Sequence, residues 1–204
     1  MPPEIRVGTS GYQYKHWKGD FYPKELPVKK WFEHYLQFFD TVEINNTFYR
    51  MPNEATFETW KEAAPKNFCY AIKYSRYGTH LKKLKDPKDH VDYFLERVYP
   101  LKSLLGPILG QLPPNWKRNI NRLEEFLRVL PADLRWAVEF RDTDWLHEET
   151  YEVLRRFNIS LVIHDMIPDH PRIITSNWNY MRYHGHNYSG SYTDAELNSI
   201  ADGI

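Results

Sequence analysis

The sequence has almost no cysteine, no net charge and no long hydrophobic run. Cys69 is the only cysteine among 204 residues, so no disulfide can form within the chain, as is typical of a reducing cytoplasm. No apolar run approaches the ~20 residues that a membrane-spanning helix needs, and the N-terminal MPPEIRVG lacks the pattern of a signal peptide. These absences predict a cytoplasmic protein that does not associate with membranes.

The charge balance limits the partners that the chain can attract. Lysine and arginine together number 27, as do aspartate and glutamate, so the formal net charge is zero. Such a balance argues against nucleic-acid binding through bulk charge and leaves only a local basic patch for it. We therefore expect a small-molecule partner, and we keep nucleic acid as the less favoured alternative. Nothing in the sequence indicates the oligomeric state.

Short apolar segments alternate with amphipathic helical patterns along the chain. The first helix is expected to begin at Pro27 with an apolar stripe that reaches Phe39, and the second to end before Pro65. A capping box of Thr193 and Glu196 predicts the last helix. The segment PDHPRII, between the last two strands, lacks a helical pattern. Strands are predicted over residues 5–8, 41–45, 68–73, 106–112, 135–140, 160–165 and 179–184.

Repeated strand–helix units predict a parallel sheet covered by helices. About seven such units favour an α/β fold of the TIM type, a (β/α) barrel formed as a single domain by residues 1–204. A complete barrel normally needs ~250 residues, so this barrel is expected to be incomplete or truncated at its C-terminal strand. An open doubly wound sheet is the structural alternative.

Charged residues occur where a buried strand should be apolar. In RWAVEFRDTDW, Glu139 and Arg141 point to the same side as Ala137, because side chains alternate along a strand. Most other strands also carry a polar residue near their C-terminal end, where barrel active sites lie. A neutral salt-bridge network would explain the pattern structurally, but such networks add little stability, so a ligand explains it better. The predicted set is Glu43, Lys73, Glu139, Arg141, Asp165, Arg182 and His184.

Six segments of the chain are similar to a known family. They are IRVGTSGYQYKHWKGDFYP, FFDTVEINNTFYRMP, FCYAIKYSRYGTH, ILGQLPP, AVEFRDTDW and NYMRYHGHNYSGSYTDAEL. In order, spacing and residue type they resemble the YecE-like proteins, also called domain of unknown function 72. The resemblance implies a TIM-like barrel and no particular activity, because the family is named for lacking one. Relatives continue past the last helix into a final strand with further polar residues, a segment that this sequence does not include.

The first functional hypothesis is an enzyme, a hydrolase, lyase or isomerase, that acts on a small anionic or sugar-like substrate. Lys73, Arg141 and Arg182 suit a phosphate or carboxylate group, and Arg can bind it through two hydrogen bonds. The predicted catalytic residues are Glu43, Glu139 and His184, as general acids or bases. The predicted ligand-binding residues are Tyr12, Asn45, Tyr49, Lys73, Gln111, Arg141, Asp165 and Arg182.

Two alternatives stay open. The first is a metal-dependent, phosphodiesterase-like barrel that uses Glu43, Glu139, Asp165 and His184 as ligands. Three cations on the same rim disfavour it, so we expect no cofactor. The second alternative is a binding module without chemistry, in which aromatic and basic loop residues stack on bases. Its candidates are Tyr12, Tyr14, Trp17, Tyr22, Tyr49 and Trp145 with Lys15, Lys18, Lys24 and Arg50.

Overall fold

The computed structural model describes residues 4–185 and 190–204. These residues form one parallel sheet whose strand order follows the chain, as expected for repeated βα units. Part of the last family-like segment, residues 186–189, lies outside the described residues. The strands are β1 (Thr9–Ser10), β2 (Thr41–Ile44), β3 (Cys69–Lys73), β4 (Leu105–Gln111), β5 (Trp136–Glu139), β6 (Ser160–His164) and β7 (Tyr180–Arg182).

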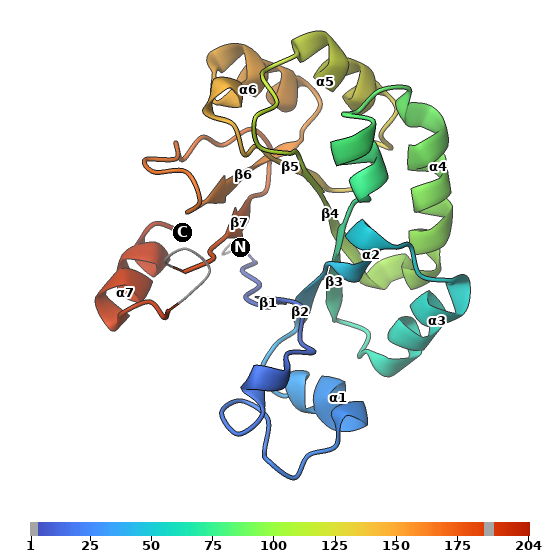
Figure 1. Cartoon of the computed structure of the whole chain (residues 1–204), viewed down its shortest axis with the longest axis vertical. Coiled ribbons are helices and arrows are strands. Elements are labelled where there is room, and N and C mark those ends of the chain that lie inside the picture. The colour runs from blue at the N-terminus through green and yellow to red at the C-terminus, as the bar shows by residue number, and fades with distance from the viewer. Residues whose placement is uncertain (1–3, 186–189) are drawn as a thin grey trace.

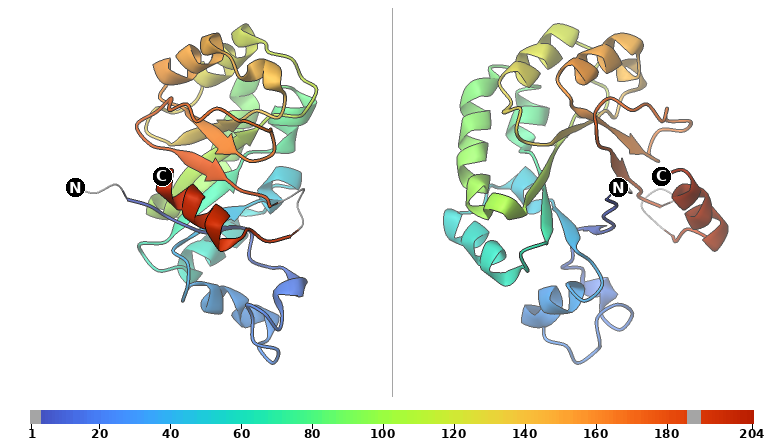
Figure 2. Two further views of the ribbon diagram at one scale, coloured as in Figure 1. Left: turned by 90° about the vertical axis from the view of Figure 1, so that its left-hand side faces the viewer. Right: turned by 180° about the vertical axis from the view of Figure 1, so that it is seen from behind.

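Helices connect most of the strands and lie outside the sheet. Figures 1 and 2 show α3 to α6 in an arc around the central strands, with α7 beside the C-terminus. None of the helices in the described parts of the chain is long and apolar enough to span a bilayer. The α-helices are α1 (Trp31–Tyr35), α2 (Asn46–Tyr49), α3 (Glu54–Ala63), α4 (Pro87–Val98), α5 (Ile120–Arg128), α6 (Glu148–Arg156) and α7 (Asp194–Asp202). Shorter 3₁₀ or π turns are Lys15–Trp17, Val28–Lys30, Tyr77–Leu81, Tyr99–Leu104 and Thr143–Trp145.

The sheet curves into an incomplete TIM-type barrel. Each of β2 to β6 pairs with two neighbours, whereas β1 pairs with β2 and β7 pairs with β6 among the described residues. The α/β class and the incomplete barrel predicted from the sequence are therefore confirmed.

The two faces of the sheet carry different residues, as the period of two requires. The outer face packs its apolar side chains, including Ile72 and Trp136, into the main core under the helices. The inner face holds a smaller apolar cluster of Leu109, Ala137 and Val162. Cys69 is buried and packs closely on Gly106, where a Cβ atom would lie 2.3 Å from its sulfur. This packing agrees with a structural role for the cysteine.

The helix starts follow local capping chemistry. The side chain of Asn53 accepts a hydrogen bond from the Thr56 amide at 3.0 Å at the start of α3. The predicted capping box of Thr193 and Glu196 is present at the start of α7 and is therefore confirmed. Pro87 occupies the first turn of α4, where its missing N–H has no intrahelical partner to lose.

Most predicted strands agree with the structure to within two residues at each end, whereas the first strand and the first helix differ by more. The first strand lies at Thr9–Ser10 instead of residues 5–8, and Val7 is 67% exposed. Backbone pairing with β2 covers only Thr9 and Ser10, and the preceding segment is held by its side chains instead, with the Arg6 guanidinium bonded to the Asn67 carbonyl at 2.8 Å. The first helix is also shorter than predicted, since the chain tightens into i→i+3 turns after Tyr35 and leaves Phe38 60% exposed.

The prediction that loop aromatics form a stacking surface at the mouth is wrong for two of them. Tyr22 is fully buried and stacks on Trp31, with ring centres 4.5 Å apart. Trp145 is also fully buried, and its Nε1 donates to the carbonyl of Trp116 at 2.6 Å. Both rings pack in the interior, Tyr22 on Trp31 and Trp145 on Phe140.

Candidate functional site

The strand register gathers the predicted charged residues at the C-terminal end of the sheet. Ser10 lies opposite Glu43 in the β1–β2 pair, Gln111 lies opposite Glu139, and His164 lies opposite Arg182. We call this end of the sheet the mouth. We call the following residues the charged cluster: Glu43, Lys73, Glu139, Arg141, Asp165, Arg182 and His184.

Arg182 connects two buried glutamates inside the mouth. Its Nε and Nη2 donate to both oxygens of Glu43 at 2.9 and 2.8 Å, and its Nη1 donates to Glu139 at 2.6 Å. Glu43 also accepts hydrogen bonds from Ser10 Oγ at 2.5 Å and from the Tyr180 hydroxyl at 2.9 Å. The two carboxylates therefore hold Arg182 in one orientation, because a guanidinium is planar and its donors have fixed directions.

The glutamates are charged at neutral pH. Burial raises the pKa of Glu43 and Glu139, but the charge and hydrogen bonds of Arg182 outweigh burial, so both pKa values lie below the ordinary range. Arg141 provides Glu139 with a second cation, because its Nε donates to Oε1. With their oxygens occupied, the glutamates are better placed to orient the arginines than to act as general bases. Their predicted catalytic role stays a prediction.

Lys73 differs from the two arginines in its pairing. In the part of the chain that the structure describes, no carboxylate forms an ion pair with its ammonium group. The Nζ donates to Gln111 Oε1 at 2.8 Å and lies 4.4 Å from the centre of the Phe48 ring. Burial, reinforced by the charge of Arg182, lowers the pKa of Lys73 to about 8. Lys73 is therefore the cation that is best placed to receive an external anion.

Asp165 orients His184 beside the arginines. The Oδ1 of Asp165 lies 2.9 Å from His184 Nδ1, and Oδ2 accepts the His184 amide at 2.8 Å. On the other side of the ring, Arg141 Nη2 lies 3.4 Å from His184 Nε2. Because arginine has only donors, Nε2 is the acceptor and the ring proton belongs on Nδ1. Nε2 can take a proton when the Arg141 donor turns from it, for example toward a bound anion.

Ser10 and Asn45 complete the polar wall of the mouth. Asn45 Nδ2 donates to Ser10 Oγ at 2.7 Å, and Ser10 in turn bonds to Glu43. The Oδ1 of Asn45 is buried and has no hydrogen-bond partner among the described residues. A ligand hydroxyl or amide would satisfy it. Asn45 was a predicted site residue, whereas Ser10 was missed, although it is the last residue of β1 and barrel sites are built at the C-terminal ends of strands.

The other predicted ligand-binding residues divide into two groups. Gln111 reaches the mouth, where it accepts from Lys73. Tyr12 instead packs on Phe32 in the helix layer, with ring centres 5.0 Å apart. Tyr49 is 76% exposed on α2, outside the hydrogen bonds of the charged cluster. A neighbouring aromatic, Tyr14, is the one whose hydroxyl bonds to the Ser10 carbonyl beside Glu43.

No group of three or more His, Cys, Asp or Glu residues among residues 4–185 and 190–204 is arranged to hold a metal ion. All four ligands predicted for a metal have other partners. Glu43 and Glu139 bind Arg182, and Asp165 binds His184.

A buried histidine, His164, packs on the half-buried His170, and this pair should make folding sensitive to acid. The rings of His164 and His170 are 4.4 Å apart, and burial, together with the charge of His164, lowers the pKa of His170 to about 4. The unfolded chain binds a proton at His170 near pH ~6.5, so stability should fall as the pH drops from ~6.5 toward 4. Since His170 is only half-buried, we expect about 1 kcal/mol from it across this window.

Urea unfolding of wild type and His170→Gln at several pH values measures this loss. The variant should show a flatter dependence between about pH 6.5 and 5. His16→Gln, on the exposed turn Lys15–Trp17, is the matched control and should follow the wild type. Identical slopes for wild type and His170→Gln would contradict the assignment.

The fold and the mouth together define an incomplete TIM-type α/β barrel with a charged polar site at the C-terminal ends of its strands. Over residues 6–204 the sequence matches the family described as Protein of unknown function DUF72, and the chain belongs to this family. The resemblance seen in the sequence is thereby confirmed.

Two curated relatives carry names without a stated function. The UPF0759 protein YecE of Escherichia coli (strain K12) is 30% identical over 144 residues, which are 68% of this chain and 53% of that protein. The chain thus spans about half the length of that relative. The UPF0759 protein YunF of Bacillus subtilis (strain 168) is 24% identical over 210 residues, covering 91% of this chain and 72% of that protein.

Solved structures of the same family share the fold. A DUF72 family protein from Thermotoga maritima MSB8 has a TM-score of 0.85 and 31% identity, covering 97% of this chain and 85% of that one. A DUF72 family protein from Enterococcus faecalis V583 has a TM-score of 0.76 at 20% identity, covering 98% and 83%, and supports the fold alone. None of these descriptions states a substrate or a reaction.

Proposed function

We propose that the mouth binds a small hydroxylated anion, bearing a phosphate or carboxylate group, and that His184 transfers a proton during its conversion. The observation that carries the proposal is Lys73, a buried cation whose ammonium is not paired with a carboxylate of the described residues. An anion held there would gain a charge-assisted hydrogen bond in a site of low dielectric.

Two other polar groups of the mouth support a hydroxylated, sugar-like ligand. The Oδ1 of Asn45 is a buried acceptor without a donor among the described residues, and a substrate hydroxyl would supply that hydrogen bond. On the far side, His184 presents Nε2 next to Arg141, so a proton acceptor and a cation lie together. Removal of a proton next to a carbonyl or phosphate group creates negative charge that such cations stabilise. Lyase or isomerase chemistry would follow from this arrangement.

The test is sulfate binding by titration calorimetry, because sulfate stays fully ionised as the pH changes. Affinity should fall as the pH rises above about 8, since Lys73 loses its proton there. Lys73→Arg should bind sulfate with little pH dependence between about pH 7 and 10, because arginine stays protonated. Lys73→Met should weaken binding by about tenfold or more at neutral pH.

Lys88→Met is the matched control, because this lysine lies on the outside of α4 and pairs with Asp92. It should leave sulfate binding unchanged. If Lys73→Met also binds sulfate as the wild type does, the anion site lies elsewhere and the proposal is wrong.

A further inference from the structure

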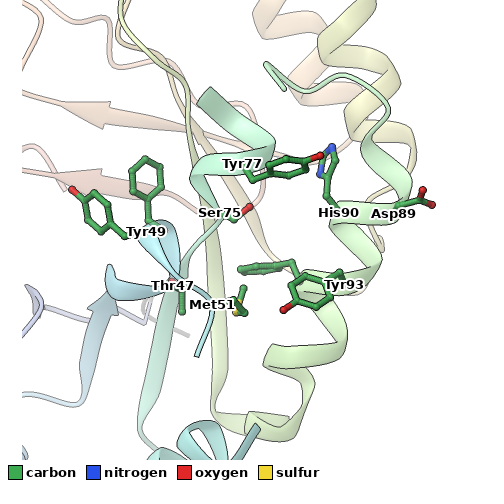
Figure 3. A pocket seen from close by; sticks show the side chains of 10 residues that line it. Thr47, Tyr49, Met51, Ser75, Tyr77, Asp89, His90 and Tyr93 are labelled. Carbon is green, nitrogen blue, oxygen red and sulfur yellow. The ribbon is translucent and has the colours of Figure 1, made fainter. Parts of the chain in front are cut away.

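Beside the mouth, an aromatic pocket opens between α2, the turn Tyr77–Leu81 and α4. Its volume is about 440 Å³, which is in the range of small-molecule sites. Figure 3 shows Tyr77 and Tyr93 on one side of this pocket, whereas the side chain of Tyr49, on α2 at the other side, points away from them. Phe48 also lines the pocket, and its ring lies beneath Lys73, so this side chain separates the pocket from the charged cluster.

The three tyrosines offer ring surface to solvent. Tyr49, Tyr77 and Tyr93 are 76, 50 and 51% exposed, although all three line a concave site. Large aromatic side chains left open in a pocket are typical of sites that stack flat rings. Asp89 also lines the pocket, but in Figure 3 its carboxylate lies at the outer edge and points away from the tyrosines. This orientation disfavours an organic cation as the ligand.

A second pocket adjoins the first and is basic. Its volume is about 690 Å³, and it shares Tyr49, Met51 and Tyr93 with the aromatic pocket. Arg50 and Arg97 line it, and neither forms an ion pair with a carboxylate in the described ranges. The guanidinium of Arg97 lies 5.4 Å from the centre of the Tyr93 ring. Its Nε is buried and has no hydrogen-bond partner among the described residues.

We infer that the joined pockets bind a nucleotide, with the base stacked on the ring of Tyr93 or Tyr77 and the phosphate on Arg50 and Arg97. The aromatic half supplies stacking faces, and the basic half supplies two unpaired guanidinium groups, which suit a phosphate. The Nε of Arg97 would gain the acceptor that it lacks. This site is separate from the mouth and does not depend on the proposed function, because none of its lining residues belongs to the charged cluster.

Calorimetric titration of the full chain with adenosine 5′-monophosphate, adenosine, inorganic phosphate and phosphocholine tests the inference. The monophosphate should bind more tightly than adenosine or phosphate alone. Tyr93→Ala should weaken monophosphate binding by about tenfold, since stacking on one aromatic ring is lost. In Arg50→Gln/Arg97→Gln, monophosphate and adenosine should bind equally, because the phosphate contact is gone.

Matched controls use residues outside both pockets. Tyr99→Ala and Arg128→Gln remove an exposed tyrosine and an exposed arginine and should leave monophosphate binding unchanged. In a Lys73→Met background, which removes the anion site proposed at the mouth, monophosphate binding should still depend on Tyr93 and on Arg50 and Arg97, so the two sites are tested separately. If a short single-stranded oligonucleotide binds more tightly than the monophosphate through the same tyrosines and arginines, the nucleotide that this site recognises is part of a nucleic-acid chain and is not a free nucleotide.

Three results would overturn the inference. The first is no binding of the monophosphate at millimolar concentration. The second is tighter binding of phosphocholine than of the monophosphate, which would make the aromatic pocket a cation site. The third is monophosphate binding that survives Tyr93→Ala and Arg50→Gln/Arg97→Gln but disappears in Lys73→Met, which would place the ligand in the mouth.

Discussion

Replacement of Arg182 by glutamine should destabilise the protein by about 4 kcal/mol at neutral pH. The side chain of Arg182 is 9% exposed and bonds to both Glu43 and Glu139, whose side chains are 7 and 0% exposed. Without the guanidinium, Glu43 is a buried carboxylate that has lost its ion-pair partner, and removing one member of a buried pair is strongly destabilising. A loss of this size should lower the melting temperature by roughly 10 °C.

The pH dependence separates this explanation from simple loss of packing. With Arg182 present, the pKa of Glu43 is depressed, so its contribution to stability is present above the unfolded value and is lost as the pH falls through the folded one. Without Arg182, burial raises that pKa, and the variant should approach the wild type in acid as Glu43 takes up a proton. A deficit that stays constant with pH would contradict the charge argument.

A double substitution gives the sharpest control. Glu43→Gln/Arg182→Gln removes both charges of the pair, while Glu139 keeps its bond from Arg141. The double variant should therefore recover about half or more of the unfolding free energy that Arg182→Gln loses. Arg128→Gln breaks a surface pair with Glu124 on α5 and should cost less than about 1 kcal/mol. Denaturant unfolding of all four proteins measures these differences.

Strand periodicity explains why the charged cluster could be predicted. Glu139 and Arg141 lie two residues apart, so their side chains point to the same face of the strand. That face could not be the one covered by helices, because burying charges against an apolar layer is costly. The same rule placed Glu43, Lys73 and Arg182 on the inner face before any contact was known. Because all strands run parallel, their C-terminal ends lie at the same end of the sheet, so the charged side chains there were expected to lie close together.

The sequence could not show which charges pair. Arg182 binds Glu43 across 139 residues of chain, and no local pattern connects them. The positions of loop side chains were harder to predict, because loops have no repeating side-chain pattern like that of a strand or helix. Tyr12 was expected at the site but packs on α1, whereas the Tyr14 hydroxyl bonds to the Ser10 carbonyl beside Glu43. The aromatic pocket also escaped prediction. It is built from α2 and α4, and α2 is a single turn without an apolar stripe.

Substitution of Asp165 by asparagine should lower turnover by about two to four orders of magnitude, once a substrate of the proposed class is supplied. The reason is the position of the ring proton. In the wild type, Asp165 Oδ1 holds the proton on His184 Nδ1, which leaves Nε2 as the acceptor toward the mouth. Substrate affinity should change little, because the cations that bind the anion stay in place.

The geometry determines how the asparagine amide is oriented. Oδ2 of Asp165 accepts two donors, the His184 amide at 2.8 Å and the Tyr192 hydroxyl. The oxygen of an asparagine should therefore occupy this place, and its NH₂ group should face His184 Nδ1. An NH₂ donor there requires an unprotonated Nδ1, so the proton moves to Nε2 and the base is lost.

Nitrogen-15 NMR of the His184 ring tests this step without any substrate. The wild type should show the proton on Nδ1 and Asp165→Asn should show it on Nε2. Tyr192→Phe is the matched control, because it removes one donor to Oδ2 and leaves the bond between Oδ1 and Nδ1 in place. It should keep the wild-type tautomer and most of the turnover. If Asp165→Asn has the wild-type tautomer, or loses affinity instead of turnover, His184 is not the proton acceptor and the mouth is a binding site whose chemistry lies elsewhere.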